Sequence, residues 1–232
     1  MSVREQKVYF DELAELFGIY AEDIDPVYRN WIEPNIPASG KRAVDLGCGS
    51  GRFVDLLAKR YDGVLGVDIA EREIEMARAK HRQPHVVFET RSLLDVTAER
   101  DGLFDLVFSV NTIYHLQDHE NVLPHVKSLV APGGHVVVVD IVDPGQWRSI
   151  DWHVSQAFAY AEESYRNRSR DHNVAADVLR LFLHPTWLQH MKDNIPLTRP
   201  EFRRHYSTAF PGAEFTDDIY SVVAAMKWQA PE

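Results

Sequence analysis

The sequence lacks several features that would narrow its class at once. Its 232 residues include a single cysteine, Cys48, so no disulfide can form within the chain, which is typical of a reducing compartment. No stretch approaches the ~20 consecutive apolar residues of a membrane helix, and the first residues do not have the apolar run of a signal peptide. These absences favour a cytoplasmic protein that does not act at a membrane.

Positive charge is also scarce, with 25 Lys and Arg against 35 Asp and Glu and a formal net charge of −10. A protein that neutralises phosphates needs the opposite balance, so nucleic acid is a disfavoured partner. His115 and His119 lie four residues apart, but a metal site would need a third ligand that the sequence does not offer. We therefore expect no bound metal.

Between residues 41 and 143, short apolar runs alternate with segments of helical spacing. The spacing predicts strands at 42–47, 63–70, 85–92, 104–111 and 135–143, with helices near 51–61, 71–81 and 120–130 between them. This alternation is typical of right-handed βαβ units and a parallel sheet. A further helix is expected at 199–210, and two closing strands at 212–219 and 221–228.

Two segments do not follow this alternation. Residues 4–33 carry apolar side chains at helical spacing and predict one or two helices before a loop at 33–40. Residues 146–194 contain no convincing strand and are helical and rich in aromatic side chains. We expect one domain with three parts: an N-terminal helical lid at 1–40, a ligand-binding core at 41–145 and 195–232, and an inserted helical cap at 146–194.

The stretch AVDLGCGSGRFVDLLA, residues 43–58, carries the clearest functional signal. Ligands of an open parallel sheet bind beyond the carboxyl ends of its strands, where this glycine loop is expected, and glycine lets a ligand approach the backbone closely. The dinucleotide fingerprint G-x-G-x-x-G would need glycine where Arg52 stands. A nicotinamide dehydrogenase is therefore a disfavoured alternative.

Two acids define the ligand further. Asp45, directly before the loop, would repel a pyrophosphate and attract an ammonium group. Asp68 ends the second expected strand about 20 residues further on, where an acid can accept both hydroxyls of a ribose. A ligand with a ribose, an ammonium group and no pyrophosphate satisfies both acids, and S-adenosyl-L-methionine is such a ligand.

The runs VDLGCGSG, GVDIA, FDLVFSVNTIYHL and LVAPGGHVVVVD resemble, in this order, the motifs of class I S-adenosylmethionine-dependent methyltransferases. The resemblance covers about residues 40–143 and is nearest to the ubiquinone/menaquinone-methyltransferase-like subgroup of small-molecule enzymes. It implies an α/β fold with a Rossmann-like, doubly wound, mostly parallel seven-stranded sheet, the last strand antiparallel, plus N-terminal helices and a helical insertion after strand five. It also implies S-adenosyl-L-homocysteine as a product.

The resemblance assigns cofactor contacts to ten residues. The loop and Asp45 would hold the methionine part, Asp68 the ribose, and the residues after strands two and three the adenine. In the N-terminal helix Phe17 stands where the family has a tyrosine, so that Tyr9 or Tyr20 would replace its hydrogen bond. The predicted cofactor-binding residues are Asp45, Gly47, Cys48, Gly49, Asp68, Ile69, Ser92, Leu93, Asn111 and Tyr20.

Two residues are candidates for catalysis. His115 follows the fourth expected strand, and an ordinary imidazole pKa near ~6.5 suits a general base or a group that orients the substrate, although a lone histidine is more often structural. Asp140 and Asp143 end the fifth expected strand, where one of them could orient or deprotonate a substrate hydroxyl or simply form a turn before Pro144. Of these two acids, Asp140 is the stronger candidate.

The sequence and the resemblance together predict methyl transfer from S-adenosylmethionine to a small molecule, at oxygen or carbon rather than nitrogen, by positioning with help from a base. Strand four ends in NTIY, which does not match the Asn/Asp-Pro-Pro-aromatic motif of nucleic-acid amino methyltransferases. Two alternatives stay open: an S-adenosylmethionine-binding enzyme with non-transfer chemistry such as cyclisation, and a non-catalytic cofactor-binding protein. A monomer and a homodimer are both compatible with the sequence.

Overall fold

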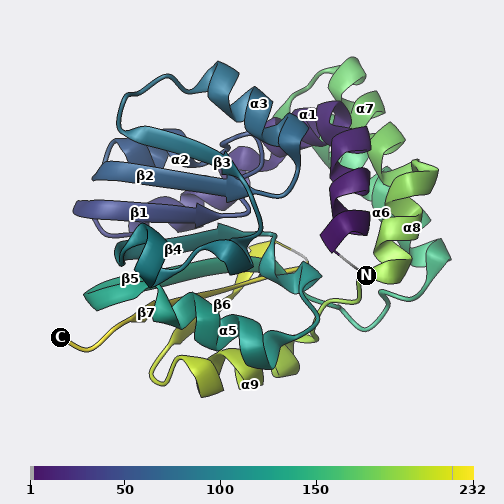
Figure 1. Cartoon of the computed structure of the whole chain (residues 1–232). Coiled ribbons are helices and arrows are strands. Elements are labelled where there is room, and N and C mark those ends of the chain that lie inside the picture. Colours follow the sequence, from purple (N-terminus) through teal and green to yellow (C-terminus); the bar gives the residue numbers. More distant parts are fainter. Residues whose placement is uncertain (1–2, 221) are drawn as a thin grey trace.

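A seven-stranded β-sheet forms the centre of the protein (Figure 1). The computed structural model describes the backbone of residues 3–220 and 222–232, and within them the side chains of all residues from 11 on except 218. The strands lie in the order β3-β2-β1-β4-β5-β7-β6. They are β1 (Gly40–Leu46), β2 (Tyr61–Asp68), β3 (Val86–Thr90), β4 (Phe104–Val110), β5 (Val130–Ile141), β6 (Glu214–Tyr220) and β7 (Val223–Gln229).

The pairing of the strands confirms the predicted fold class. The pairs β3–β2, β2–β1, β1–β4 and β4–β5 are parallel, and the last strand, β7, runs antiparallel to both of its neighbours. Successive residues of β5 contribute to different cores: Val137 and Val139 face one side of the sheet, and Val136 and Val138 face the other. Both faces are covered, which is why these strands read as unbroken apolar runs in the sequence.

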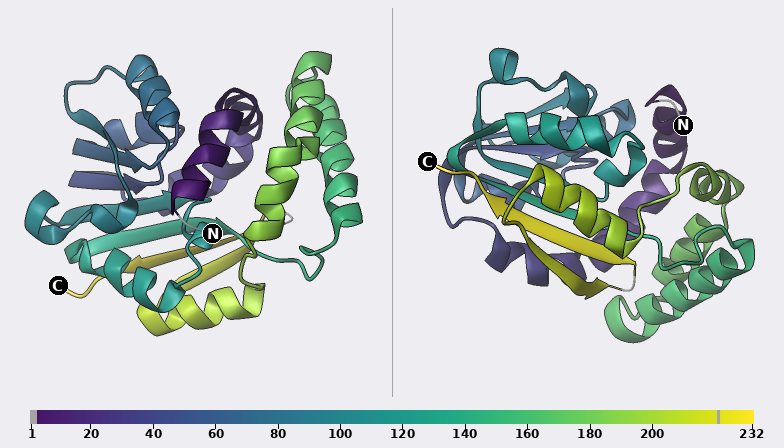
Figure 2. Two further views of the ribbon diagram at one scale, coloured as in Figure 1. Left: turned by 45° about the vertical axis from the view of Figure 1, so that its right-hand side comes forward. Right: turned by 90° about the horizontal axis from the view of Figure 1, so that it is seen from below.

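Helices cover both faces. On one side α1 (Val3–Asn35), α2 (Val54–Ala58) and α3 (Glu71–Lys80) pack on the sheet. On the other side lie α5 (His119–Ser128) and α9 (Arg199–Ala209), seen from below in Figure 2. The short elements between strands are the 3₁₀ turns η1 (Leu93–Asp95) and η2 (Ile113–His115) and the single-turn helix α4 (Ala98–Asp101).

Several element boundaries differ from the expectation, most of them by one or two residues. The N-terminal helix α1 continues to Asn35 through Pro34, which shortens the expected loop. The helix expected at 51–61 is only α2, because the residues before Val54 are held in turns that follow the glycine loop. Strand β5 begins at Val130 rather than at 135, because Val130 already pairs with Phe104; His135 pairs with Leu106, and the residues between, with both glycines, lie in a bulge of the ladder.

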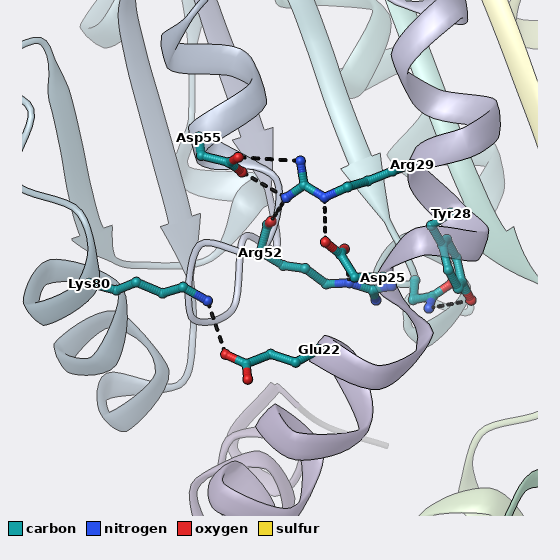
Figure 3. A network of polar contacts seen from close by, with 8 residues as sticks. Glu22, Asp25, Tyr28, Arg29, Arg52, Asp55 and Lys80 are labelled. Carbon is teal, nitrogen blue, oxygen red and sulfur yellow. Dashed lines mark hydrogen bonds and ion pairs between the residues drawn. The ribbon is translucent and has the colours of Figure 1, made fainter. Parts of the chain in front are cut away.

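Helix α1 reaches from the sheet to the inserted segment. Its middle and C-terminal turns place Ile24, Tyr28 and Ile32 in the core beside the sheet. Its earlier turns contact the inserted helices, where Leu13 joins a separate apolar cluster. Pro26 lies inside the helix, where proline removes a backbone hydrogen bond, and Figure 3 shows different helix directions before and after this point.

The predicted helical insertion after strand five is confirmed. It consists of α6 (Ile150–Glu163), the π-helical turn η3 (Ser164–Arg168), α7 (His172–Leu183) and α8 (Pro185–Asp193). These helices stand beside α1, beyond the carboxyl ends of the parallel strands (Figure 2). Arg168 of η3 pairs with Asp23 of α1 at 2.7 Å, and both side chains are buried, which ties the insertion to α1. No helix in the described part of the chain combines the length and apolarity needed to cross a bilayer.

The core supports a prediction about stability. Phe108 of β4 is fully buried and packs edge-on against Phe53 with ring centroids 5.7 Å apart. Phe108→Ala is expected to lower the free energy of unfolding by about 3–5 kcal/mol, because it removes a buried ring and leaves a cavity. Chemical denaturation measures the loss. The control is Phe158→Ala on α6, where the ring is 57% exposed and a change within about 0.5 kcal/mol is expected; equal losses would contradict the assigned core.

Candidate active site

A cavity lies at the carboxyl ends of β1, β2 and β4, with a volume of about 1040 Å³ when the solvent at its mouth is included. This is the position where open parallel sheets bind their ligands. Nine of the ten predicted cofactor-binding residues line it, and so does His115. The nine are Asp45, Gly47, Cys48, Gly49, Asp68, Ile69, Ser92, Leu93 and Asn111.

The glycine loop uses its own backbone donors within the protein. The amides of Gly47 and Cys48 donate to the Val67 carbonyl at 2.8 and 3.0 Å, and that of Gly49 donates to the Asp68 carboxylate at 2.9 Å. The Ser50 amide donates to Glu73, and the Gly51 amide to the Cys48 carbonyl. A pyrophosphate site needs free amides at such a loop. The hydrogen bonding of the loop therefore argues against a dinucleotide ligand. The sequence indicates the same, because Arg52 stands where the dinucleotide fingerprint needs glycine.

Gly47 is required for steric reasons. Its φ is +79°, a region that side chains disfavour, and a Cβ there would lie 2.1 Å from the Thr112 hydroxyl oxygen. The same Thr112 hydroxyl donates to the Gly47 carbonyl at 3.3 Å. The loop after β1 and the turn after β4 are therefore in direct contact, and this contact forms one wall of the cavity.

Three carboxyl groups surround the loop with raised pKa values. Burial, and then repulsion from Asp68, raises the pKa of Asp45 to about 8. Burial also raises the pKa of Asp68, although the amides of Ala70 and Gly49 oppose the shift. Burial, and then Asp68, raises the pKa of Glu73 to about 7. Carboxyl groups in mutual repulsion at low dielectric are stabilised as anions by a nearby cation, so this cavity favours a positively charged ligand.

Cys48 lines the cavity as a neutral thiol. A position at a helix N-terminus can lower a cysteine pKa, but here burial, followed by repulsion from Asp45, Asp68 and Glu73, raises the pKa of the Cys48 thiol well above its usual value. A thiol with a raised pKa is a poor nucleophile. The structure therefore gives Cys48 the role of a small wall residue.

Asn111 holds a strained backbone at the end of β4. Its φ is +53°, a conformation in which asparagine is enriched among non-glycine residues, and its amide donates to the Val139 carbonyl at 2.8 Å. Its side-chain Nδ2 donates to the Tyr28 hydroxyl of α1 at 2.9 Å. Such strain concentrates where the position of a side chain matters for function.

A network of charged groups holds α1 against the glycine loop (Figure 3). Arg52 pairs with Asp25 at 2.9 Å, and its guanidinium lies over the Tyr28 ring at 4.5 Å from the centroid. Arg29 pairs with Asp25 and, at 2.7 Å, with Asp55 of α2. The network joins the helix that borders the cavity to the loop that forms its floor.

A second cavity adjoins the first and is mostly aromatic. The two cavities share Phe17, Arg52, Asn111 and His115, so they meet at these residues. Of the aromatic residues that the sequence placed in the inserted segment, five line the second cavity, whereas Phe158 and Tyr165 lie on the exposed side. Its aromatic lining is Phe17, Tyr20, Tyr28, Tyr114, Trp147, Trp152, Tyr160, Phe182, Trp187 and Tyr220.

Tyr20 belongs to this second cavity rather than to the first. Its ring packs edge-on against Phe182 with centroids 4.9 Å apart, and burial raises the pKa of its hydroxyl well above the usual value. Phe17 borders both cavities. The side chain of Tyr9, the other expected substitute for the family's tyrosine, lies outside the described residues.

His115 stands where the two cavities meet. It is carried by η2, directly after β4, and is only 7% exposed. Burial, and then the neighbouring His190, lowers the pKa of His115 well below its ordinary value. The ring is therefore uncharged at neutral pH, and an uncharged imidazole has one nitrogen lone pair that can accept a hydrogen bond.

Asp140 and Asp143, the two acids at the end of β5, line neither of the two cavities. Asp140 is 1% exposed and accepts hydrogen bonds from the backbone of Ile141, Tyr114 and Thr112. Burial raises its pKa well above the usual value. Asp143 accepts from the amides of Gly145 and Trp147 at 2.6 and 3.1 Å, which is the turn role weighed for it.

Sequence reasoning missed several lining residues. Glu73, Thr112 and Tyr28 carry no motif, because each belongs to a segment that reads as an ordinary helix or turn. Arg52 also lines both cavities, but in the sequence it stands out only because it departs from the dinucleotide fingerprint. Glu73 lies with Ile74 and Ala77 on the buried side of α3. An acid among the apolar positions of this helix is the sequence signal that could have pointed to Glu73. Among the described residues, no group of three or more His, Cys, Asp or Glu is placed to hold a metal ion.

The fold and the cavity define a class: α/β proteins that bind a cationic nucleoside-type cofactor at a glycine loop after β1. Comparison with family models identifies the family, because a methyltransferase-domain model matches residues 20–206. The chain belongs to this methyltransferase family, within the class I S-adenosylmethionine-dependent methyltransferases.

Curated relatives include the ubiquinone biosynthesis O-methyltransferases of Pseudomonas aeruginosa, 31% identical over 121 residues, and of Acinetobacter baylyi, 32% identical over 132 residues. These alignments cover 51% and 55% of this chain and 52% and 55% of the relatives. The chain therefore spans about half the length of the curated relatives it matches.

Solved structures share the fold along almost the whole chain. A structure described as a DhpI–SAH complex is similar with a TM-score of 0.66 at 17% identity, covering 99% of this chain and 98% of that one. A putative S-adenosylmethionine-dependent methyltransferase from Listeria monocytogenes is similar with a TM-score of 0.59 at 13% identity, covering 89% and 99%. At these identities the similarity shows a common fold.

The contact between Gly47 and Thr112 supports a second prediction. Gly47→Ala is expected to lower the free energy of unfolding by about 2–5 kcal/mol, because it adds backbone strain and forces a Cβ against Thr112. The control is Gly145→Ala, where φ is +90° but nothing lies within 4 Å, so only the strain of about 1–2 kcal/mol is expected. Denaturation of both variants measures the difference, and equal losses would contradict the packed contact.

Proposed function

We propose that this protein transfers a methyl group from S-adenosylmethionine to the hydroxyl of a small aromatic molecule. The observation that carries the proposal is the meeting of two cavities at His115, one with buried acids and one with aromatic walls. When bound, S-adenosylmethionine supplies a methyl group already activated by its sulfonium. The residues of the protein then have to bind, orient and exclude water.

The first cavity suits the cofactor in charge and in hydrogen-bond acceptors. Asp45 would hold the ammonium group and Asp68 the ribose hydroxyls, while Ile69, Ser92 and Leu93 lie where the adenine is expected. The carboxyl groups gain a cation that offsets their mutual repulsion. The amides of the glycine loop donate to protein acceptors rather than to a phosphate. The cavity therefore favours a cationic cofactor over a phosphate-bearing one.

The second cavity suits an aromatic acceptor. Flat rings pack well against aromatic walls in offset or edge-on arrangements. The polar groups at its boundary with the first cavity, Asn111, Arg52 and His115, are placed to orient a hydroxyl there. Curated relatives include ubiquinone biosynthesis O-methyltransferases, and this name supports oxygen as the acceptor atom.

His115 would accept the proton of that hydroxyl. Its lowered pKa keeps the ring uncharged and makes it a weak base, which suits an acidic phenol or catechol better than an alcohol. Asp140 would act on His115 through the backbone, because it accepts from Thr112 and Tyr114 and so fixes the turn η2. Asp140 is thus proposed as a positioning residue.

The lid at 1–40 and the cap at 146–194 would enclose the acceptor and keep water out, because α1 and the inserted helices supply most of the second cavity's walls. The core at 41–145 and 195–232 would hold the cofactor. A cytoplasmic location and a monomeric or homodimeric state stay predictions. Nothing in the arrangement of the cavities favours cyclisation or a non-catalytic role over methyl transfer.

The charge of the first cavity gives a prediction for binding. Isothermal calorimetry should show micromolar binding of S-adenosylmethionine and S-adenosylhomocysteine but not of NAD, lost in Asp68→Ala and kept in the exposed control Asp62→Ala. Free protein holds protons on Asp45 and Glu73 up to pH values of about 8 and about 7. A cationic ligand lowers both pKa values, so protons are released and affinity should rise from pH 6 to 9. Affinity that falls with pH would sink the charge argument.

The reaction itself is tested by turnover with catechols, phenols, enols and amines, following both S-adenosylhomocysteine and the methylated product. We expect a phenol or catechol to be methylated at oxygen. His115→Gln should lower kcat by about 10²- to 10⁴-fold while the KM for S-adenosylmethionine stays within a few-fold. His119→Gln, at a buried histidine that lines neither cavity, is the matched control. Cofactor consumption without methyl gain would indicate the non-transfer alternative.

A further inference from the structure

Helix α6 places two polar side chains in the mostly aromatic wall of the second cavity. His153 and Gln156 lie three residues apart on this helix, so they face the same side of it, and both line the second cavity. Neither lines the first cavity, and the residues that the two cavities share do not include them. The pair therefore lies away from the junction at which His115 stands.

The ring of His153 is held in one orientation. Its Nε2 lies 2.6 Å from the Trp147 carbonyl oxygen, and because a carbonyl only accepts, Nε2 carries the proton of this hydrogen bond. The ring packs edge-on against Trp147 and Trp152, with centroids 5.3 and 5.0 Å apart. Trp147 is fixed in turn, since its indole donates to the carbonyls of Met191 and Asn194 at 3.1 and 2.7 Å. The orientation of His153 is thus set before any ligand binds.

The other ring nitrogen of His153 is an acceptor without a partner. Burial lowers the pKa of His153, against smaller opposite effects of the Trp147 carbonyl and the charge of Asp143, so the ring is uncharged at neutral pH. With the proton on Nε2, the lone pair is on Nδ1. In the part of the chain that the structure describes, no donor bonds this Nδ1, although His153 is only 9% exposed. A polar atom buried without a partner is costly, and a ligand donor would remove that cost.

Gln156 adds a donor beside this acceptor. Its half-buried carboxamide forms no hydrogen bond within the described residues, so its two N–H groups and its oxygen can serve a ligand. Among the described lining residues of the second cavity, Arg52 alone is permanently charged, and it belongs to the junction, where Asp25 pairs with it. The cavity wall around His153 and Gln156 is therefore uncharged.

A hydroxyl group satisfies both side chains at once. It can donate to Nδ1 of His153 and accept from the amide of Gln156, whereas a carboxylate, a ketone or an ether only accepts and would face the lone pair of Nδ1. An ammonium group only donates. The cavity measures about 780 Å³ when the solvent at its mouth is included, within the ~300–1,000 Å³ of small-molecule sites. One ligand can therefore extend from His115 to α6.

We propose that His153 and Gln156 form a subsite for a second hydroxyl of the methyl acceptor, remote from the hydroxyl that loses its proton to His115. The inference rests on the proposed function, because it assumes an aromatic acceptor in the second cavity. It narrows the substrate class to uncharged aromatic compounds with hydroxyl groups at two separate ends. An acceptor with a carboxylate at the α6 end is disfavoured, because the carboxylate and Nδ1 are both acceptors.

Nitrogen-15 NMR of the histidine rings in the intact protein is the first test. Without ligand, the His153 ring should show a protonated Nε2 and an unprotonated Nδ1 at neutral pH. The probes are hydroquinone and a dihydroxybiphenyl with one hydroxyl on each ring, each compared with its dimethyl ether, with and without S-adenosylhomocysteine. At least one of these diols, which sample two separations of the hydroxyl groups, should shift the Nδ1 signal. Its ether has the same skeleton but no donor, so it should leave that signal unchanged.

Calorimetric affinities for the same probes test the contribution of Gln156. Gln156→Met keeps the length of the side chain and removes its donors, so it should weaken binding of the diol by about 3- to 10-fold and leave binding of the ether unchanged. His153→Phe keeps a ring between the two tryptophans and should remove the preference for the diol. Gln189→Met, at an exposed residue of α8 outside both cavities, is the matched control and should bind the diol like the wild type.

A proton on Nδ1 of His153 in the free protein would overturn the inference. So would equal responses to a diol and its ether, binding of neither, or a wild-type preference for the diol in Gln156→Met, the variant that remains informative if His153→Phe does not fold. The proposed function fails separately, because it is contradicted by the absence of cofactor binding or of a methylated product. A phenol that is methylated without a shift of the His153 signal would keep the proposed function and overturn this inference.

Discussion

The hydrogen bonds of the glycine loop are the constraint on which the rest of the site depends. Five successive amides, from Gly47 to Gly51, donate to protein acceptors, among them the Val67 carbonyl and the carboxylates of Asp68 and Glu73. The loop consequently presents acids rather than free donors to the cavity. An anion is disfavoured there and a cation is favoured, and this preference separates the site from a dinucleotide site on a similar sheet.

The glycine loop also determines the position of α1. Arg52 ends the glycine segment, stacks on Tyr28 and pairs with Asp25, so α1 is attached to the loop by charge and by an aromatic contact (Figure 3). Helix α1 in turn carries the wall of the second cavity and is joined to the inserted helices by Arg168 and Asp23. The position of the aromatic cavity is thus determined by the contacts of α1 with the glycine loop on one side and with the inserted helices on the other.

Several energetically unfavourable features lie at this same edge of the sheet. Buried carboxyl groups with raised pKa values, a strained Asn111 and an uncharged His115 all lie within the two cavities or their shared boundary. Strained backbone and buried ionisable groups destabilise a fold locally, and proteins commonly retain them at functional sites. The central strands β4 and β5, by contrast, are largely apolar and covered on both faces, and this burial provides stability that offsets these costs.

The sequence by itself determined the sheet and the order of the motifs, and nine of the ten residues predicted to bind the cofactor line the first cavity, because these features depend on strand periodicity and on short loops between neighbouring strands. Only the tertiary structure decided the rest. Tyr20 lies in the second cavity and Asp140 in neither, since the orientation of a helix and the depth of a strand end depend on packing. The ring of His190 on α8 lies 5.0 Å from that of His115 although 75 residues separate them in the sequence, a contact that no local spacing encodes because it forms only when the inserted helices pack against the core.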